Sequence, residues 1–370
     1  MGTPRLGTSR IPIERVAVSA FTVPTDAPEA DGTLHWDKTT MVVVEVSAGG
    51  HKGLGYTYAD TATARLVHDK LAEVVKGYDA LAVPAVHAAM VREVRNLGRP
   101  GIASMAISAV DVALWDLKAR LFEVPLVTLL GGARDAVPIY GSGGFTSYSI
   151  ERLCEQLGGW VAAGIGAVKM KVGEHPEADL ERVRAARRAI GGEATLMVDA
   201  NGAYGRKEAL AMAERFAEVD VRWFEEPVSS DDLEGLRLLH DRAPAGMVIA
   251  AGEYGYDLPY FVRMLEAGAV DVLQVDITRC GGVTVFLQAG ALTAARSLDL
   301  SGHTAPALHV HAACAVPRLR HLEYFHDHVR IENLLLDGTP QPRSGVLRPD
   351  VSRPGLGLEL RRADAARYAV

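Results

Sequence analysis

The sequence predicts an α/β fold, a parallel β/α barrel joined to a second, α+β region. The chain has 370 residues, which is about the size of a barrel with an additional domain. From residue 131 onward, short apolar segments alternate with amphipathic segments of helical period, as expected of parallel strands joined by helices. Neither GxGxxG nor GxxxxGK[ST] follows any apolar segment, which disfavours an open nucleotide-binding sheet.

The composition is that of a globular protein and excludes several partners. Hydrophobic residues make up 48% of the chain and charged residues 23%, enough for a sizeable core. The net charge of −7 leaves no basic surplus for nucleic acid or an anionic membrane. Cys154, Cys280 and Cys314 are widely spaced, which favours a reducing compartment. With no apolar segment resembling an export signal or anchor, we expect a cytoplasmic protein.

Residues 1–130 are predicted to form the α+β domain. The segments 16–23 and 39–60 are rich in Val, Thr and Tyr and broken by glycines, which indicates strands. Between them, residues 24–38 are rich in Pro, Asp and Gly, which predicts a long surface loop of the kind that covers active sites. From 61 to about 130 the pattern is helical, most clearly in the recurrence of Ile107, Val110, Leu114 and Leu117.

Residues 131–332 are predicted to form the barrel. Its strand cores can be read from the sequence as VPIYG, AVKMKV, TLMVDA, VRWFEEP, MVIAAGE, DVLQVD, a weaker LDLSGH, and HLEYF. Residues 333–370 are punctuated by Pro and Gly and no longer alternate. We expect this C-terminal segment to return to the first domain.

Lys169 and Lys171 lie two residues apart on the second predicted barrel strand, so their side chains leave the same face. On an inward face, burial and mutual repulsion would lower the pKa of a lysine and make it a usable base. Two solvated lysines on an edge strand are the alternative, which the apolar Val168, Met170 and Val172 disfavour.

Asp199, Glu225 and Glu253 end three successive predicted strands, each about one βα repeat apart. Barrel enzymes carry their chemistry at these strand ends. Any one of these carboxylates alone would more readily be explained as a helix cap. Three meeting at one barrel mouth would repel each other unless a cation joined them, and oxygen ligands suit a hard ion such as Mg²⁺.

Three further polar residues end the last predicted strands. Asp276 lies one repeat before His303, so the carboxylate can orient one imidazole nitrogen and leave the other free for proton transfer. A lone histidine is more often structural, and His309 and His311 follow closely. Glu323 on the final strand could donate a hydrogen bond if burial keeps it protonated.

The ordered series KxK, DxN, E-P, GE, D-x-x-x-x-G-G, H and E resembles the enolase superfamily, and within it the mandelate racemase subgroup. The resemblance spans the whole chain and implies a (β/α)₇β TIM-like barrel under a capping domain that the C-terminal tail completes. It also implies removal of a proton alpha to a carboxylate through an enediolate. The roles it implies are base for Lys171, its neighbour and substrate contact for Lys169, Mg²⁺ ligands for Asp199, Glu225 and Glu253, substrate contact for Asn201, a dyad for His303 and Asp276, and electrophilic acid for Glu323.

The position that holds a second lysine base in the muconate-lactonising relatives is Asp276 here, and no lysine follows Lys207. His303 is therefore left to act opposite Lys171. It could protonate a departing 3-hydroxyl, which dehydrates an acid sugar to a 2-keto-3-deoxy acid, or return a proton to carbon, which racemises a 2-hydroxy acid. Analogy with relatives that share this pairing favours dehydration. A non-catalytic binding relative and a metal-dependent aldolase remain as rival interpretations.

Segments near 26–37 and 53–60 are expected to close over a small carboxylate substrate. Their aromatic and polar residues could contact it or only anchor the loops, and the family resemblance further suggests a homo-oligomer, a dimer or an octamer. The candidate contacts are His35, Trp36, Tyr56 and Tyr58.

Overall fold

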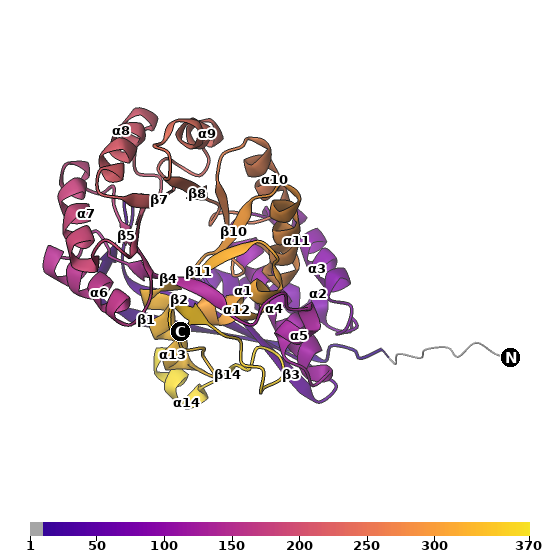
Figure 1. Cartoon of the computed structure of the whole chain (residues 1–370). Helices are drawn as coiled ribbons and strands as arrows, with labels where there is room; N and C mark the ends of the chain where they lie inside the picture. Colours follow the sequence, from indigo (N-terminus) through magenta and orange to yellow (C-terminus); the bar gives the residue numbers. More distant parts are fainter. Residues whose placement is uncertain (1–9) are drawn as a thin grey trace.

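The computed structural model describes residues 10–370 and is built around a closed parallel barrel (Figure 1). Strands pair in the order β4 to β11, and the pairing of β11 with β4 closes the ring. All the predicted strand cores are found as strands. They are β4 Val137–Gly143, β5 Ala167–Lys171, β6 Thr195–Asp199, β7 Val221–Glu225, β8 Val248–Ala251, β9 Val272–Val275, β10 Asp299–Gly302 and β11 Leu319–Phe325.

A helix follows each of the first seven barrel strands, so the barrel within residues 137–325 is of the (β/α)₇β type, as the family resemblance implied. Figure 1 shows these helices as an outer ring. They are α6 Ile150–Ala162, α7 Pro176–Ile190, α8 Arg206–Ala217, α9 Leu233–Arg242, α10 Leu258–Glu266, α11 Gly282–Ala295 and α12 Pro306–Ala315.

Strand β5 explains how the barrel separates core from site. Val168 and Met170 are fully buried in the hydrophobic core that includes residues of the helices, whereas Lys169 and Lys171 alternate with them and point inward. Deeper in the barrel, a layer of apolar side chains contains Met197 and Trp223, each two residues before a mouth carboxylate. This apolar layer forms the floor on which the charged groups of the mouth rest.

The N-terminal region is an antiparallel sheet of β1 Arg15–Ala30, β2 His35–Ala48 and β3 His51–Tyr58 packed on helices. The long helix α4 Ile102–Leu121 lies on β3 at two glycines, because a Cβ on Gly53 would come 2.1 Å from the Ala113 carbonyl oxygen. The equivalent distance for Gly55 is 2.3 Å, to the Ala109 carbonyl oxygen. The other helical segments are α1 Thr61–Leu66, η1 Val67–Leu71, α2 Ala72–Val75, α3 Val83–Glu93, η2 Arg95–Leu97 and α5 Leu126–Leu130.

The loop predicted at residues 24–38 is instead mostly strand. Residues 24–38 form a long β-hairpin, with a shift of register between Pro24 and Glu29. Its tip is closed by Asp31, whose carboxylate accepts hydrogen bonds from the backbone N–H of Thr33 at 2.6 Å and of Leu34 at 2.7 Å. Residues 53–58, which the sequence predicts to be strand, belong to β3. Pro, Asp and Gly here mark a bulge and a tight turn in a strand pair, not an open loop.

The C-terminal segment returns to the N-terminal region, as expected. Arg120 on α4 binds Glu359 at 2.6 Å, and the backbone N–H of Val370 donates to the carbonyl of Ala20 on β1 at 3.1 Å. β13 also adds an antiparallel strand to β4. The elements of the C-terminal segment follow α13 His326–Leu335. They are β12 Leu336–Asp337, β13 Val346–Leu347, β14 Glu359–Leu360, α14 Arg362–Ala365 and η3 Ala366–Tyr368.

Among the described residues, we find no helix with both the length and the apolar character needed to span a bilayer.

Candidate active site

The three predicted metal ligands converge at the barrel mouth. Asp199 and Glu225 are the last residues of β6 and β7, and Glu253 follows β8 by two residues. One carboxylate oxygen from each lies within 4.8 Å of the others, and all three side chains are buried. This is the geometry that a shared divalent cation requires of all-oxygen ligands.

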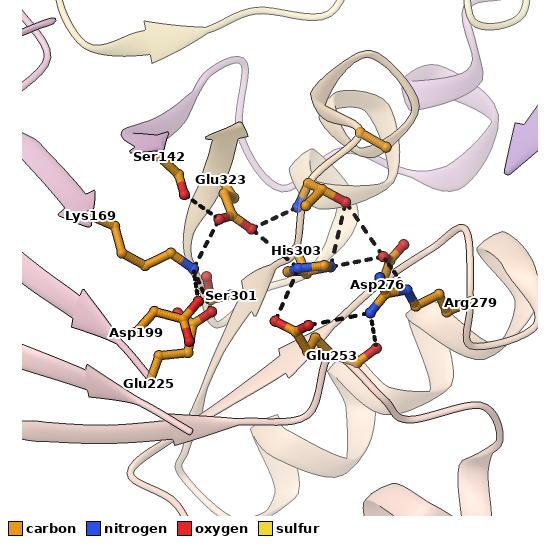
Figure 2. Close-up of polar contacts among 12 residues, drawn as sticks. Ser142, Lys169, Asp199, Glu225, Glu253, Asp276, Arg279, Ser301, His303 and Glu323 are labelled. Carbon is orange, nitrogen blue, oxygen red and sulfur yellow. Dashed lines mark hydrogen bonds and ion pairs between the residues drawn. The ribbon is translucent and has the colours of Figure 1, made fainter. Parts of the chain in front are cut away.

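Both lysines of β5 reach these carboxylates. Lys169 is fully buried and pairs with Glu225, with Asp199 at 3.3 Å and with Glu323 at 2.9 Å (Figure 2). The Lys171 ammonium lies 2.6 Å from Asp199 Oδ2 and 2.9 Å from Asn201 Oδ1. The sequence predicted that both lysines lie on one inward face, and both side chains lie on that face in the structure.

The expected low pKa of the lysines is wrong for this arrangement of charges. Burial lowers the pKa of Lys171 and so does the charge of Lys169, as anticipated, but Asp199 and the other mouth carboxylates raise it further than these effects lower it. The pKa of Lys169 is likewise raised, because Glu225 and Glu323 outweigh its burial. The two ammonium groups act here as counterions of the carboxylates.

The His303 and Asp276 dyad is formed. Nδ1 of His303 lies 2.8 Å from Asp276, which is itself oriented by the backbone N–H of Thr278 at 2.7 Å, and Nε2 faces Glu253 at 3.1 Å. Burial acts to lower the pKa of His303, but Glu253, Glu323 and Asp276 together raise it to about 10. The imidazole therefore carries a proton in this arrangement.

The two neighbouring histidines have structural hydrogen bonds. His309 accepts the backbone N–H of Ile277 at 2.9 Å, and its other nitrogen meets the carbonyl of Ala305 at 3.0 Å. His311 accepts the backbone N–H of Val127 at 3.2 Å. Both imidazoles thus serve the backbone, which leaves His303 as the histidine of the dyad.

Glu323 faces the site, but not in the protonated state that we expected. It accepts hydrogen bonds from the hydroxyl of Ser142 at 2.6 Å and from the backbone N–H of Thr304 at 3.1 Å. Burial acts to raise the pKa of Glu323, yet Lys169 and His303 lower it to about 2. It is an ionised acceptor here, and its role toward a substrate stays a prediction.

The carboxylates fit a magnesium ion by their chemistry as well as their spacing. Burial and the charge of Asp199 raise the pKa of Glu225 to about 8, which reports the repulsion that a bound cation would relieve. Oε2 of Glu253 is buried and accepts no well-formed hydrogen bond from the described residues, although Nε2 of His303 is near. Asp199, Glu225 and Glu253 are therefore the residues that would hold the ion.

A cavity of about 380 Å³ lies between the barrel mouth and the capping hairpin. Lys171, Asn201 and His303 line it from the barrel. Of the four predicted cap contacts, Trp36 and Tyr58 line the cavity and the other two do not. His35 lies 3.0 Å from Glu174 on the exposed rim, and the hydroxyl of buried Tyr56 donates to Glu332 at 2.6 Å.

The hairpin tip is seated on the barrel through a glycine. A Cβ on Gly32 would lie 2.4 Å from the Ala200 carbonyl oxygen and 2.7 Å from that of Val172. The loop after β4 holds the same tip, because the backbone N–H of Thr146 donates to the carbonyl of Ala30 at 2.9 Å. The hairpin tip thus contacts the barrel through backbone at the edge of the cavity.

Several lining residues were missed by sequence reasoning. Arg279 lies three residues after Asp276, and its guanidinium is 3.4 Å from Glu253 and 3.5 Å from Asp276. Its position in DITRCGG could have suggested it. Sequence reasoning assigned no role to the others, which include Tyr254, Thr304, Phe325 and His328.

A closed β/α barrel in which three carboxylates converge beside a cavity lined by two proton-carrying groups defines a class, the metal-dependent barrel enzymes. Matches to two protein-family models narrow this class to one superfamily. Residues 16–131 match the mandelate racemase / muconate lactonizing enzyme N-terminal domain, and residues 152–365 match the enolase C-terminal domain-like family. The chain therefore belongs to the enolase superfamily, in its mandelate racemase subgroup, and is a Mg²⁺-dependent lyase or isomerase.

Characterised relatives and solved structures agree with this assignment. The chain is 34% identical to a 3,6-anhydro-alpha-L-galactonate cycloisomerase of Streptomyces coelicolor (97% of this chain, 99% of that one) and 31% identical to an L-talarate/galactarate dehydratase of Salmonella typhimurium (85% and 81%). It resembles the structure of a mandelate racemase/muconate lactonizing enzyme-like protein from Rubrobacter xylanophilus (TM-score 0.95, 59% identity, 97% and 99%). It also resembles a Streptomyces coelicolor racemase solved with bound magnesium (TM-score 0.91, 32% identity, 97% and 100%).

Proposed function

We propose that this protein dehydrates an acid sugar to a 2-keto-3-deoxy acid. The supporting observation is that Lys171 and His303 line one cavity from non-adjacent strands, β5 and the end of β10, with the three carboxylates on the strands between them. A substrate carboxylate near those ligands would place its C2 and C3 between a base and an acid. The relatives named as acid-sugar enzymes support the substrate class.

The site must first bind and polarise the substrate carboxylate. Lys169 is fully buried among the mouth carboxylates and would contact one carboxylate oxygen of the substrate, and Asn201 lines the cavity beside Lys171. When bound, Mg²⁺ supplies Lewis-acid stabilisation of the charge that develops on the carboxylate. Fixed cationic groups aimed at that charge lower the barrier because they need no reorganisation during the reaction.

Lys171 would then take the proton from C2 as the free amine. Burial and the positive charge of Lys169 favour that neutral form by lowering the pKa of Lys171, and Asp199 opposes them. The electron pair of the C2–H bond moves toward the carboxylate, which gives an enediolate. Asn201 Oδ1, 2.9 Å from the Lys171 amine, fixes the direction of that nitrogen.

His303 would complete the elimination as a general acid. Its proton passes to the 3-hydroxyl as the C3–O bond breaks, and the electrons of the enediolate form the C2–C3 double bond. One water leaves, and the resulting enol takes a proton at C3 to become the 2-keto acid. Asp276 holds the imidazole in place through Nδ1 and stabilises its protonated form.

Ring opening of an anhydro acid is a second candidate, favoured by the 34% identity over 97% of the chain to a cycloisomerase. The first step is the same. If the oxygen at C3 belongs to a ring ether, its departure opens the ring and no atoms are lost. The product is then an isomer of the substrate.

The test is to incubate the protein and Mg²⁺ with a library of acid sugars and anhydro acids in D₂O and to analyse the products by mass spectrometry. Dehydration predicts a 2-keto acid that has lost one water. An isomeric keto acid would indicate ring opening, and recovered acid labelled at C2 and of the opposite C2 configuration, separated by chiral chromatography, would indicate racemisation. Lys171→Ala should abolish all of these, whereas Lys207→Ala, on the exposed face of α8, should not. Turnover that survives Lys171→Ala would contradict the proposal.

A further inference from the structure

The sequence HDHVRIE, residues 326–332, begins helix α13 and has no part in the chemistry described so far. Several of its side chains join the barrel to the capping sheet. His326 lies 3.1 Å from Asp26 on β1, Asp327 accepts a hydrogen bond from Thr39 on β2 at 2.5 Å, and Glu332 accepts one from Tyr56 on β3. His328 differs from these, because its side chain lines the active-site cavity.

Packing from both domains fixes the ring of His328. It stacks on Tyr58 of the cap, with ring centroids 3.4 Å apart and planes 12° from parallel. Phe325 of the barrel meets it edge-on at 5.0 Å. The Tyr58 hydroxyl also donates to the backbone carbonyl of His328 at 3.2 Å. The ring orientation therefore does not depend on hydrogen bonds to the imidazole.

The imidazole keeps hydrogen-bonding capacity that the protein does not use. His328 is only 8% exposed, and its Nδ1 is buried without a partner among residues 10–370. Burial holds the pKa of His328 down at about 3, so the ring is neutral, with one donor and one acceptor nitrogen. Buried polar atoms are normally satisfied. The ring lines the cavity and neither of its nitrogens is engaged by residues 10–370, so it can take a hydrogen-bond partner from outside the chain.

We propose that His328 is a substrate-binding residue that hydrogen-bonds a hydroxyl group of the substrate beyond C3. This inference rests on the proposed function and narrows its substrates to acid sugars with a free hydroxyl group beyond C3. A hydroxyl both donates and accepts, as a neutral imidazole does, whereas an aromatic 2-hydroxy acid would leave the ring nitrogens unpaired. A site built to pair with a hydroxyl discriminates strongly against compounds that lack it.

The central variant is His328→Phe, which keeps a flat ring against Tyr58 and removes both nitrogens. For the preferred acid sugar we expect KM to rise about tenfold to a hundredfold, with a smaller change in kcat because the chemistry at C2 is untouched. His328→Asn and His328→Gln place an amide near the positions of Nδ1 and Nε2, respectively. Partial recovery by one of them identifies the nitrogen that makes the contact.

Substrate analogues separate a contact from a structural effect. Acid sugars that lack a single hydroxyl beyond C3 are compared for wild type and His328→Phe. We expect one deoxy analogue to be a poorer substrate for wild type and to show no further loss with the variant. His326→Gln, on the same helix but outside the cavity lining, should leave this pattern unchanged. Thermal melting checks that each variant is folded.

The outcomes distinguish the two proposals. If wild type turns over an acid sugar and His328→Phe has the same KM, or loses kcat/KM equally for the parent and every deoxy analogue, the role of His328 is overturned and the proposed function stands. If wild type turns over no acid sugar, the proposed function is overturned and this inference with it.

Discussion

At the scale of single residues, the charges of the mouth determine how each proton carrier can act. Asp199 raises the pKa of Lys171, and the charge of Lys169 lowers it. Which effect dominates depends on whether the carboxylates have another counterion, because a nearby cation lowers the pKa of an ammonium group. The raised lysine pKa and the proposed role of Lys171 as a base are therefore compatible.

The dyad gives a prediction at this scale. Asp276→Asn should lower kcat about a hundredfold or more and change KM little, because the imidazole loses the carboxylate that orients and charges it. Asp276 raises the pKa of His303, so its removal lowers that pKa, and the activity that needs protonated His303 is lost at a lower pH. Rates measured across a pH series check both effects.

The control is Asp299→Asn, at the opposite end of the neighbouring strand, where Asp299 pairs with Arg318 near the surface. It should leave kcat and the pH profile as in wild type. An Asp276→Asn enzyme with wild-type kcat would show that the dyad has no catalytic role.

At the scale of elements, the cap and barrel meet through close backbone contacts that leave no room for a side chain. Gly32→Ala should lift the hairpin tip from the loops after β5 and β6, because its Cβ would overlap the carbonyl oxygens of Val172 and Ala200. We expect KM to rise about tenfold or more while the melting temperature changes little, since the tip is a small part of the fold. Steady-state kinetics and thermal melting measure the two effects.

Gly159→Ala on α6 is the matched control, because a Cβ there meets no atom within 4 Å. It should leave KM unchanged and stabilise the helix slightly. If Gly32→Ala also leaves KM unchanged, the seated tip has no role in binding.

Helix α13 carries a buried carboxyl group, that of Glu332, which contacts Tyr56 on strand β3. The protonation of this group should make the stability of the protein depend on pH. Glu332 is 2% exposed and contacts Tyr56, and burial raises its pKa to about 8. The folded state therefore favours the protonated form. Protonated Glu332 contributes its full stabilisation of the folded state below about pH 4.3, the pKa of a glutamate in the unfolded chain. This contribution is lost as the pH rises through about 8, the pKa in the folded state.

Glu332→Gln stays neutral at every pH and should not show this loss. The free energy of unfolding of wild type relative to the variant should fall between about pH 5 and pH 8, by up to roughly a few kcal/mol. Urea unfolding at both pH values measures it, with the exposed Glu208→Gln on α8 expected to follow wild type. A difference that is constant with pH would refute the assignment.

At the scale of the whole molecule, the barrel could be predicted because each strand carries its own signal. Even the weak segment LDLSGH forms β10, since the flanking helices and strands leave a single place for it in the ring. The hairpin at 24–38 could not be predicted from the sequence, because its Pro, Asp and Gly residues are equally typical of loops. Its pairing depends on β2, which local composition does not describe.

The candidate site also has features that could be predicted from the sequence and features that could not. Asp199, Glu225 and Glu253 could be predicted to meet because parallel strands end at one face of the barrel. The ionised state of Glu323 could not be predicted, since it depends on the distances to Lys169 and His303. The different positions of the two tyrosines could not be predicted either, because both lie on one strand. Tyr58 lines the cavity, whereas Tyr56 is hydrogen-bonded to Glu332.

The claim on which the function depends is that Lys171 removes a proton from C2 of a carboxylate substrate in the presence of Mg²⁺. It is tested most directly with the preferred acid sugar carrying deuterium at C2. We predict a primary isotope effect on kcat/KM and no reaction with Lys171→Ala or after chelation of the metal. Equal kcat/KM values for the deuterated and the unlabelled sugar, or turnover by Lys171→Ala, would contradict the account.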